Sequence, residues 1–319
     1  MTHGVRTTGA ALGIAILLVA DATVGGARAE TQLERGAYLV NAVMACDGCH
    51  TPRQAGGFAM DRRFSGGSQT WDTAAYTVKG ANITRDRDTG IGTWTHDELK
   101  RTLTEGVRPN GIPLAPQMPF VFYKIMTPRD LDAVATFIES APAVQNAVQP
   151  PSYKTEMKFA LIPGAEKPMA DDDLRDPVKR GFYLATIAHC MECHSRRPDG
   201  VQDFVTWWGR GGFEFRDSWG TATARNITSH KVAGIGAWTD AEIKRVLVEG
   251  IGRDGRTLKP PMARHVYFKK MTSDDLGAII AWLRTLPPLD GSCPAPEECT
   301  AGIGTGSRSS GSDPARASP

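Results

Sequence analysis

The sequence of 319 residues predicts a mainly α-helical protein that contains two tandem copies of one domain. Three observations support this prediction. The pattern Cys-x-x-Cys-His occurs at residues 46–50 and again at residues 190–194. The residues that follow the two patterns match each other at a nearly constant spacing. Each copy also contains helix start signals of the same type at the same distance from its pattern.

The Cys-x-x-Cys-His pattern is typical of the covalent attachment site of a c-type haem. Its two thiols each bond one vinyl-derived carbon of the same porphyrin, and the adjoining imidazole faces the iron. A redox dithiol is one alternative, and a zinc site is another, but no further zinc ligands follow at the usual spacing. We therefore expect two covalently bound haem c groups, each at the centre of one cytochrome c-type domain of short helices. The predicted attachment residues are Cys46, Cys49 and His50 in the first copy, and Cys190, Cys193 and His194 in the second.

The internal repeat extends well beyond the two haem patterns. Asn-Ile-Thr at residues 82–84 recurs at residues 226–228, which is the spacing of 144 positions that separates Cys46 from Cys190. Segments reading Gly-Ile-Gly, Trp-Thr and Lys-Arg recur after it at the same spacing. Because no gap interrupts the match between the haem cysteines and a later methionine, the sequence indicates duplication of one haem-binding unit.

Each copy is expected to contain three helices, of which the first precedes the haem pattern. This helix covers residues 33–44 in the first copy and residues 178–189 in the second. Gly36 and Gly181 lie within it, where glycine costs about 1 kcal/mol relative to alanine. A close crossing with the last helix of the same copy would explain why glycine is present.

The middle helix of each copy has a start signal and a stop signal. Capping boxes at Thr95 and Thr239 predict where it begins. Gly106 and Gly250 lie at the expected C-terminal ends. The last helices, at residues 130–139 and 274–285, follow threonines of the same capping type.

The chain divides into five predicted segments. The first 29 residues resemble an export signal, because a basic start precedes an apolar run too short to span a bilayer and Ala-Arg-Ala ends the segment. We therefore expect a periplasmic protein without a transmembrane segment in its mature chain. The other predicted segments are a first cytochrome c domain at residues 30–142, a linker at residues 143–176, a second cytochrome c domain at residues 177–292 and a flexible tail at residues 293–319.

Two of these segments leave alternatives open. The linker either docks on a domain through apolar residues such as Phe159 and Ile162, or is a plain solvated connector. Cys293 and Cys299 either form a small loop disulfide, which an oxidising compartment permits, or remain unpaired thiols. Residues 303–319 are rich in Gly, Ser and Pro, so they are expected to be disordered.

A methionine is expected to supply the second axial ligand of each iron. Met118 lies 68 positions after His50, and Met262 lies 68 positions after His194. A thioether is a soft ligand that suits haem iron, and ligation by histidine and methionine raises the reduction potential. Core packing is the usual role of a methionine, but the equal spacing in two copies favours ligation. The predicted iron ligands are therefore His50, Met118, His194 and Met262.

The second copy is less regular than the first around its predicted iron. His265 follows Met262 by three positions and is the strongest rival ligand. His189 directly precedes Cys190, on the expected proximal side, and Arg264 stands beside His265. Weaker rivals elsewhere in the chain are Met60, His96 and His230.

The predicted ligand sets favour electron transfer over catalysis. Two six-coordinate irons leave no open position for a substrate, so no catalytic residue is expected. The formal net charge of +2 excludes a strong electrostatic footprint for nucleic acid. A dihaem enzyme, such as a peroxidase or a thiosulfate-oxidising cytochrome, is the alternative and needs one open iron. A structural or sensing haem module is a third possibility.

The two copies resemble the cytochrome c subunits of membrane-associated bacterial dehydrogenases, such as those that oxidise alcohol, gluconate or sorbitol. The residues that carry the resemblance are 82–84, 89–94 and 114–119 in the first copy, with 226–228 and 234–238 in the second. The resemblance covers nearly all of residues 33–289. It implies that the chain accepts electrons from a partner dehydrogenase and passes them to a downstream respiratory acceptor, such as a quinone or a terminal oxidase. Many members of that family carry three haems, whereas this chain has two attachment patterns.

Overall fold

The structure is a computed structural model that describes residues 1, 2, 4, 29–217 and 219–291. The predicted export signal falls almost entirely outside the described residues. So do Cys293, Cys299 and residues 303–319, whose predicted states stay predictions. The described residues from Thr31 onward belong to one compact unit, which contains both copies of the repeat.

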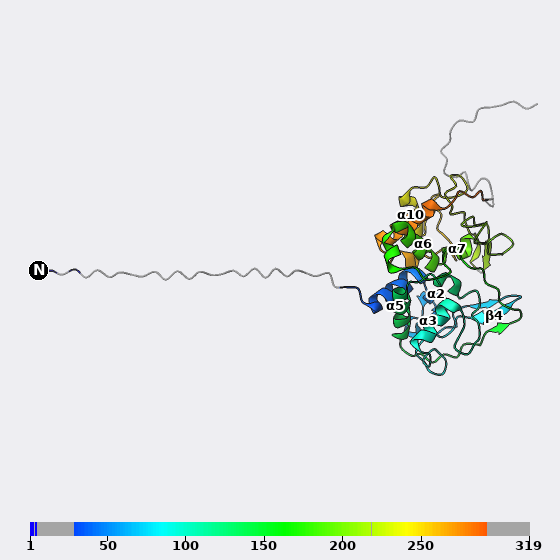
Figure 1. Ribbon diagram of the computed structural model, residues 1–319, viewed down its shortest axis with the longest axis horizontal. Coiled ribbons are helices and arrows are strands. Elements are labelled where there is room, and N and C mark those ends of the chain that lie inside the picture. The colour runs from blue at the N-terminus through cyan, green and yellow to red at the C-terminus, as the bar shows by residue number, and fades with distance from the viewer. Residues whose placement is uncertain (3, 5–28, 218, 292–319) are drawn as a thin grey trace, which may run out of the picture. The chain divides into compact units, whose positions relative to one another are not determined.

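Helices are the main regular elements of the described residues, and those of the first repeat precede those of the second (Figure 1). The first repeat contains α1 (Gln32–Tyr38), which continues into the π-helix η1 (Leu39–Met44), then α2 (Asp47–His50), α3 (His96–Glu105), α4 (Phe120–Tyr123) and α5 (Pro128–Glu139). The second contains α6 (Pro177–Ile187), α7 (Cys190–His194), α8 (Asp240–Glu249), α9 (His265–Phe268) and α10 (Ser273–Thr285). Short 3₁₀ helices occur at η2 (Met60–Arg62) and η3 (Asp171–Arg175). The three predicted helices of each copy are thus present, with two short helices added to each.

Small antiparallel sheets accompany the helices and were not predicted. The first pairs β1 (Arg53–Gln54) with β2 (Gly57–Phe58), the second joins β3 (Thr70–Asp72), β4 (Tyr76–Lys79) and β5 (Ser152–Tyr153), and the third pairs β6 (Glu214–Asp217) with β7 (Gly220–Thr223). Thr70 lies opposite Lys79, and Glu214 lies opposite Thr223. The two hairpins therefore occupy the same place in the repeat, 144 positions apart, although their sequences differ. Their short strands lack the alternation over several residues that would have predicted them.

The predicted start and stop signals of the middle helix are confirmed. The Thr95 side chain accepts a bond from the Glu98 backbone N–H at 3.2 Å, and the Glu98 carboxylate accepts one from the Thr95 N–H at 2.7 Å. Thr239 forms the same capping box in the second repeat. Gly106 and Gly250 end α3 and α8 with φ of 74° and 69°, a left-handed conformation that glycine adopts without steric cost.

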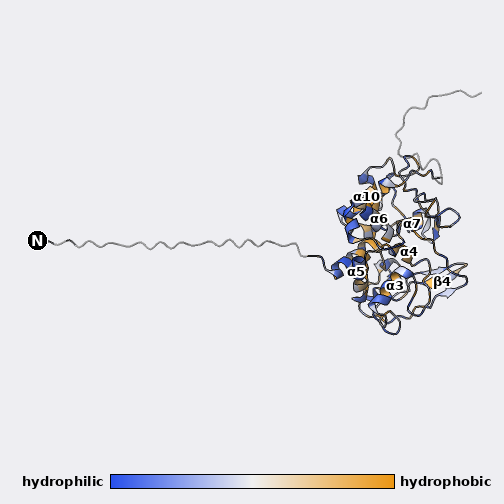
Figure 2. Ribbon diagram, viewed as in Figure 1, coloured by the Kyte–Doolittle hydropathy of each residue, from blue (hydrophilic) through white to orange (hydrophobic). Residues whose placement is uncertain are grey.

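The first and last helices of each repeat cross at the glycine, as predicted. A Cβ at Gly36 would lie 2.0 Å from the carbonyl oxygen of Ala133 in α5. A Cβ at Gly181 would lie 2.0 Å from the carbonyl oxygen of Ala278 in α10. Figure 1 shows α6 beside α10, and Figure 2 shows hydrophobic residues on these helices together with hydrophilic ones. Glycine is required because the two backbones are in contact.

The two repeats bind each other through reciprocal contacts between residues at matching positions. Tyr183 in α6 donates a hydrogen bond to Asp130 in α5 at 2.7 Å, and Tyr38 in α1 donates one to Asp275 in α10 at 2.5 Å. Arg35 also holds Asp130 through two bonds of 2.8 Å. Because each tyrosine reaches the aspartate of the other repeat, the contact is approximately two-fold. One hydrophobic core spans both repeats, which explains why they form a single compact unit.

The segment between the repeats docks on the first repeat. Asn146 donates a bond from its side-chain amide to the carbonyl of Ser65 at 2.8 Å. Strand β5 extends the sheet of β3 and β4 by pairing Tyr153 with Tyr76. Further along, Phe159 packs edge-on against Phe120, with 4.7 Å between ring centroids, and Ile162 is buried. The docked alternative of the sequence analysis therefore describes this segment.

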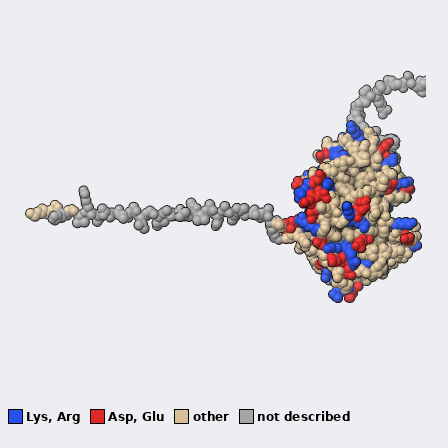
Figure 3. Space-filling model, viewed as in Figure 1, with Lys and Arg blue, Asp and Glu red and all other residues tan. Residues whose placement is uncertain are grey.

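The part of the chain that the structure describes contains no helix that is both long and apolar enough to cross a membrane. On the face drawn in Figure 3, acidic and basic side chains are interspersed.

Candidate haem sites

The two Cys-x-x-Cys-His patterns lie on the short helices α2 and α7, which begin in the same way. The residue before the first cysteine adopts the left-handed conformation in both repeats, at Ala45 with φ of 59° and at His189 with φ of 47°. For a residue with a side chain this conformation costs about 1–2 kcal/mol. It breaks the preceding helix and restarts the chain as a new turn. Cysteines three positions apart on such a turn lie on one face, which suits attachment to a single group.

The imidazoles of His50 and His194 are oriented by the same backbone contact. His50 Nδ1 lies 2.8 Å from the carbonyl oxygen of Ala81, and His194 Nδ1 lies 2.6 Å from that of Arg225. A carbonyl only accepts, so Nδ1 carries the proton and Nε2 keeps a free lone pair. Burial lowers the pKa of both imidazoles, which keeps them neutral. A neutral, oriented imidazole is the form that ligates a metal.

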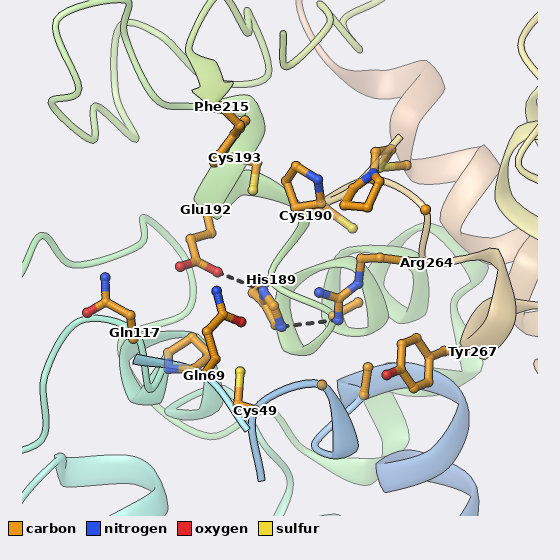
Figure 4. A pocket seen from close by; sticks show the side chains of 18 of the residues that line it. Cys49, Gln69, Gln117, His189, Cys190, Glu192, Cys193, Phe215, Arg264 and Tyr267 are labelled. Carbon is orange, nitrogen blue, oxygen red and sulfur yellow. Dashed lines mark hydrogen bonds and ion pairs between the residues drawn. The ribbon is translucent and has the colours of Figure 1, made fainter. Parts of the chain in front are cut away.

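Both haem patterns line one continuous cavity of about 2390 Å³. All four cysteines border it as free thiols, together with both histidines. Figure 4 shows Cys49 from the first repeat and Cys190 and Cys193 from the second around this cavity. Burial raises the pKa of Cys46 and Cys193 to about 12 and that of Cys49 and Cys190 to about 11. In each repeat, two cysteines beside an oriented imidazole border this cavity, and this is the set of groups that covalent haem requires.

The two candidate methionine ligands also line this cavity. Met118 and Met262 are half-buried and border it from the loops that precede α4 and α9. The cavity lining includes Arg264 and Tyr267 but not His265. The His265 ring packs instead against the end of α8, where its Nδ1 lies 2.3 Å from the position of a Cβ at Gly250.

The weaker rival ligands have other contacts in the structure. The ring of His96 bonds to Glu139 at 3.0 Å through Nδ1. His230 Nδ1 accepts bonds from the backbone of Val232 and Ala233, which closes its own loop. The Met60 side chain is largely exposed. Of the candidate ligands, the structure thus brings His50, Met118, His194 and Met262 to one cavity.

The repeated Asn-Ile-Thr segment has a structural role. Asn82 accepts bonds from the backbone and the hydroxyl of Thr84, and its amide donates to the carbonyl of Val144 at 2.8 Å. Asn226 makes the matching bond to the carbonyl of Leu289 at 2.8 Å. The segment therefore closes a loop and fastens the chain where it leaves the last helix of each repeat.

A chain of polar contacts near the second pattern was not predicted (Figure 4). Glu192 lies 2.7 Å from His189 Nδ1, and Arg264 donates to His189 Nε2 at 3.2 Å. The sequence signal for these contacts is that His189 and Arg264 occupy positions where the second copy has a different residue from the first.

Residues 178–287 match the cytochrome c family. These residues form a cytochrome c domain. The chain is also similar to the fructose dehydrogenase cytochrome subunit of Gluconobacter japonicus, with 29% identity over 80% of this chain and 52% of that protein. It is 28% identical to a dihaem cytochrome c of Cereibacter sphaeroides, over 77% of this chain and 83% of that protein. The gluconate 2-dehydrogenase cytochrome c subunit of Pantoea cypripedii is 28% identical over 82% of this chain and 60% of its own length.

These comparisons confirm the resemblance to cytochrome c subunits of bacterial dehydrogenases. The chain spans about half the length of the fructose dehydrogenase subunit. The names of these relatives describe cytochrome subunits, which agrees with the expectation of an electron-transfer component rather than a catalytic unit.

Proposed function

We propose that the chain is an exported dihaem c-type cytochrome that transfers electrons from a partner periplasmic dehydrogenase to a downstream respiratory acceptor. One observation carries the proposal. Two matched sets of attachment residues border the same cavity, and each set has its histidine held by a backbone carbonyl in the tautomer that ligates iron.

The proposal assigns a role to each set of residues. Cys46 and Cys49 would hold the first haem, and Cys190 and Cys193 the second. His50 and His194 would each ligate one iron, with Met118 and Met262 as the second protein ligands. Bound haem iron would supply reversible one-electron chemistry. The chain's own residues orient the ligands, and the cavity lining combines apolar side chains with charged ones, which together would tune the potential.

A carrier is favoured over a dihaem enzyme because each candidate set contains two protein ligands, one histidine and one methionine, for its own iron. A peroxidase or thiosulfate-oxidising enzyme would need one position free or displaceable. A dehydrogenase partner is favoured by the relatives, which are named as cytochrome subunits of fructose, gluconate and alcohol dehydrogenases. Export agrees with covalent haem c, which is attached outside the cytoplasm.

Haem stoichiometry and ligation test the proposal on the matured protein. We expect two haems per chain by the pyridine haemochrome assay, and one after either C46S/C49S or C190S/C193S. Both irons should be low-spin, with the near-infrared band of histidine–methionine ligation. Met118→Ala and Met262→Ala should each abolish half of that band, whereas His265→Ala and the exposed Met60→Ala should leave it unchanged.

Other outcomes would contradict specific parts of the proposal. A single haem per chain would exclude the dihaem assignment. A high-spin iron in the wild-type protein, together with turnover of peroxide or thiosulfate, would favour the enzymatic alternative. A wild-type band from one haem only that Met262→Ala leaves unchanged, together with a high-spin iron in His265→Ala, would assign the second ligand to His265.

A further inference from the structure

Arg264 contacts the chain just before each of the two haem attachment patterns. Its Nη2 atom donates to the carbonyl oxygen of Met44 at 3.4 Å, two positions before Cys46. The same atom lies 3.2 Å from Nε2 of His189, which directly precedes Cys190. One guanidinium thus connects the chain segments that enter α2 of the first repeat and α7 of the second.

The contacts of Arg264 do not neutralise its charge directly. In the range 29–291, apart from residue 218, its two bonded partners are a carbonyl and an imidazole, and its Nε is enclosed without a partner. Nδ1 of His189 carries the ring proton and donates it to the Glu192 carboxylate. The other ring nitrogen, Nε2, is therefore free to accept a hydrogen bond from Arg264. Glu192 is therefore separated from the guanidinium by the width of the imidazole ring.

The charge acts on both attachment sites. Arg264 borders the same cavity as Cys49, Cys190 and Cys193, and its bonds reach the chain beside both attachment patterns. Figure 4 shows the Arg264 side chain directed into the space between Cys49 and Cys190. An enclosed charge is screened less by solvent and salt than a surface charge, so its influence extends further.

The first repeat has no counterpart of this arrangement. At the positions 144 residues before His189, Glu192 and Arg264 it has Ala45, Gly48 and Phe120. The duplication therefore produced two similar haem sites, but only the second copy contributes a fixed charge between them.

We propose that Arg264 is a positioning residue that holds a positive charge between the two haem sites and raises the reduction potential of both. Reduction lowers the positive charge of an iron centre, so a nearby cation stabilises the reduced form. The inference rests on the proposed function, since it requires haem on both patterns.

Potentiometric titration of the matured full-length protein tests this inference. In R264Q we expect both midpoint potentials to fall relative to the wild type, while R264K keeps the charge and leaves both close to the wild-type values. Glu192→Gln removes the negative charge on the other side of the His189 ring, at the border of the same cavity, so it should raise both potentials. Opposite signs in the two variants distinguish an electrostatic effect from loss of packing.

Arg256→Gln is the matched control. Arg256 borders the same cavity, but it is 57% exposed and pairs with Asp254 at 2.6 Å, so solvent screens its loss. We expect no change in either potential. The inference is overturned if R264Q changes neither potential or only one, or if R256Q changes them as much. Haem content is measured first on the wild type, so that failure to bind two haems would count against the proposed function and not against the role of Arg264.

Discussion

The first and second repeats keep the same backbone contacts but differ in charge. In the first, His96 at the start of α3 bonds to Glu139 at the end of α5 at 3.0 Å. At the matching place in the second, Asp240 pairs with Arg284 at 2.8 Å. Both repeats therefore link their middle and last helices through an acid and a base. The middle helix supplies the base in the first repeat and the acid in the second. The contact between these helices is therefore set by the packing, which accepts either polarity.

The repeats also differ where they face each other. Asp130 of the first repeat is 1% exposed and binds both Arg35 and Tyr183, whereas Asp275 of the second is 8% exposed and lies 3.5 Å from Arg180. The contact between repeats is thus two-fold in topology but stronger on one side. Substitutions at matched positions of the two repeats can show which features they share and which they do not.

The largest expected effect tests a shared feature, the glycine crossing. Gly36→Ala and Gly181→Ala should each lower the free energy of unfolding by about 3 kcal/mol or more, because a Cβ would lie 2.0 Å from a backbone oxygen in both repeats. Denaturant unfolding of each variant measures this loss. Gly277→Ala in α10, where a Cβ meets nothing within 4 Å, is the control and should not destabilise the protein. A loss below about 1 kcal/mol in either crossing variant would contradict the close approach.

The next effect tests the asymmetry of the contact between repeats. Asp130→Ala should cost about 3 kcal/mol, because it removes two bonds from Arg35 and one from Tyr183 at a buried carboxylate. Asp275→Ala should cost about half as much, because its ion pair is longer. Chemical denaturation of the two variants gives the difference. Equal losses would mean that the two sides of the contact are equivalent after all.

A smaller and equal effect is expected at the capping boxes. Thr95→Ala and Thr239→Ala should each destabilise the protein by about 1 kcal/mol, since both remove a bond of 3.2 Å to an N–H at a helix start. Thermal unfolding of both variants, with Thr95→Ser and Thr239→Ser as controls that keep the hydroxyl, tests this equality. If one variant lost stability and the other did not, the two helix starts would not be equivalent.

The smallest effect is confined to the first repeat and depends on pH. Bonding to Glu139 raises the pKa of His96 above 6.5, with Asp132 adding to the effect. The stability that this pair contributes is present below pH 6.5 and is lost as the pH rises through the higher, folded-state value. The side chain is 37% exposed, so solvent limits the contribution to less than about 0.5 kcal/mol. Unfolding of the wild type and His96→Gln between pH 5 and 8 should show a gap that closes with pH; a constant gap would count against it.

Local signals in the sequence were sufficient to predict a large part of this fold. The capping boxes at Thr95 and Thr239 and the glycines at 106 and 250 depend on neighbours within one helix turn, so their residue types alone indicate where α3 and α8 begin and end. The crossings at Gly36 and Gly181 could be predicted because glycine destabilises a helix interior, so its presence there indicates a close contact that only glycine allows. The two hairpins could not be predicted, because strands of three or four residues are too short to show a clear alternation of apolar and polar residues.

Spacing along the chain was enough to predict two haem attachment patterns with matched histidines and methionines, because duplication preserves that spacing. Tertiary structure alone decided that both patterns border one cavity and that Arg264 stands between them, since residues as distant as Met44 and Arg264 meet only when the repeats pack. It also decided the roles of Asp130 and Asp275, each of which binds a tyrosine of the other repeat. Contacts across an interface depend on how two surfaces fit, and no local spacing encodes that fit.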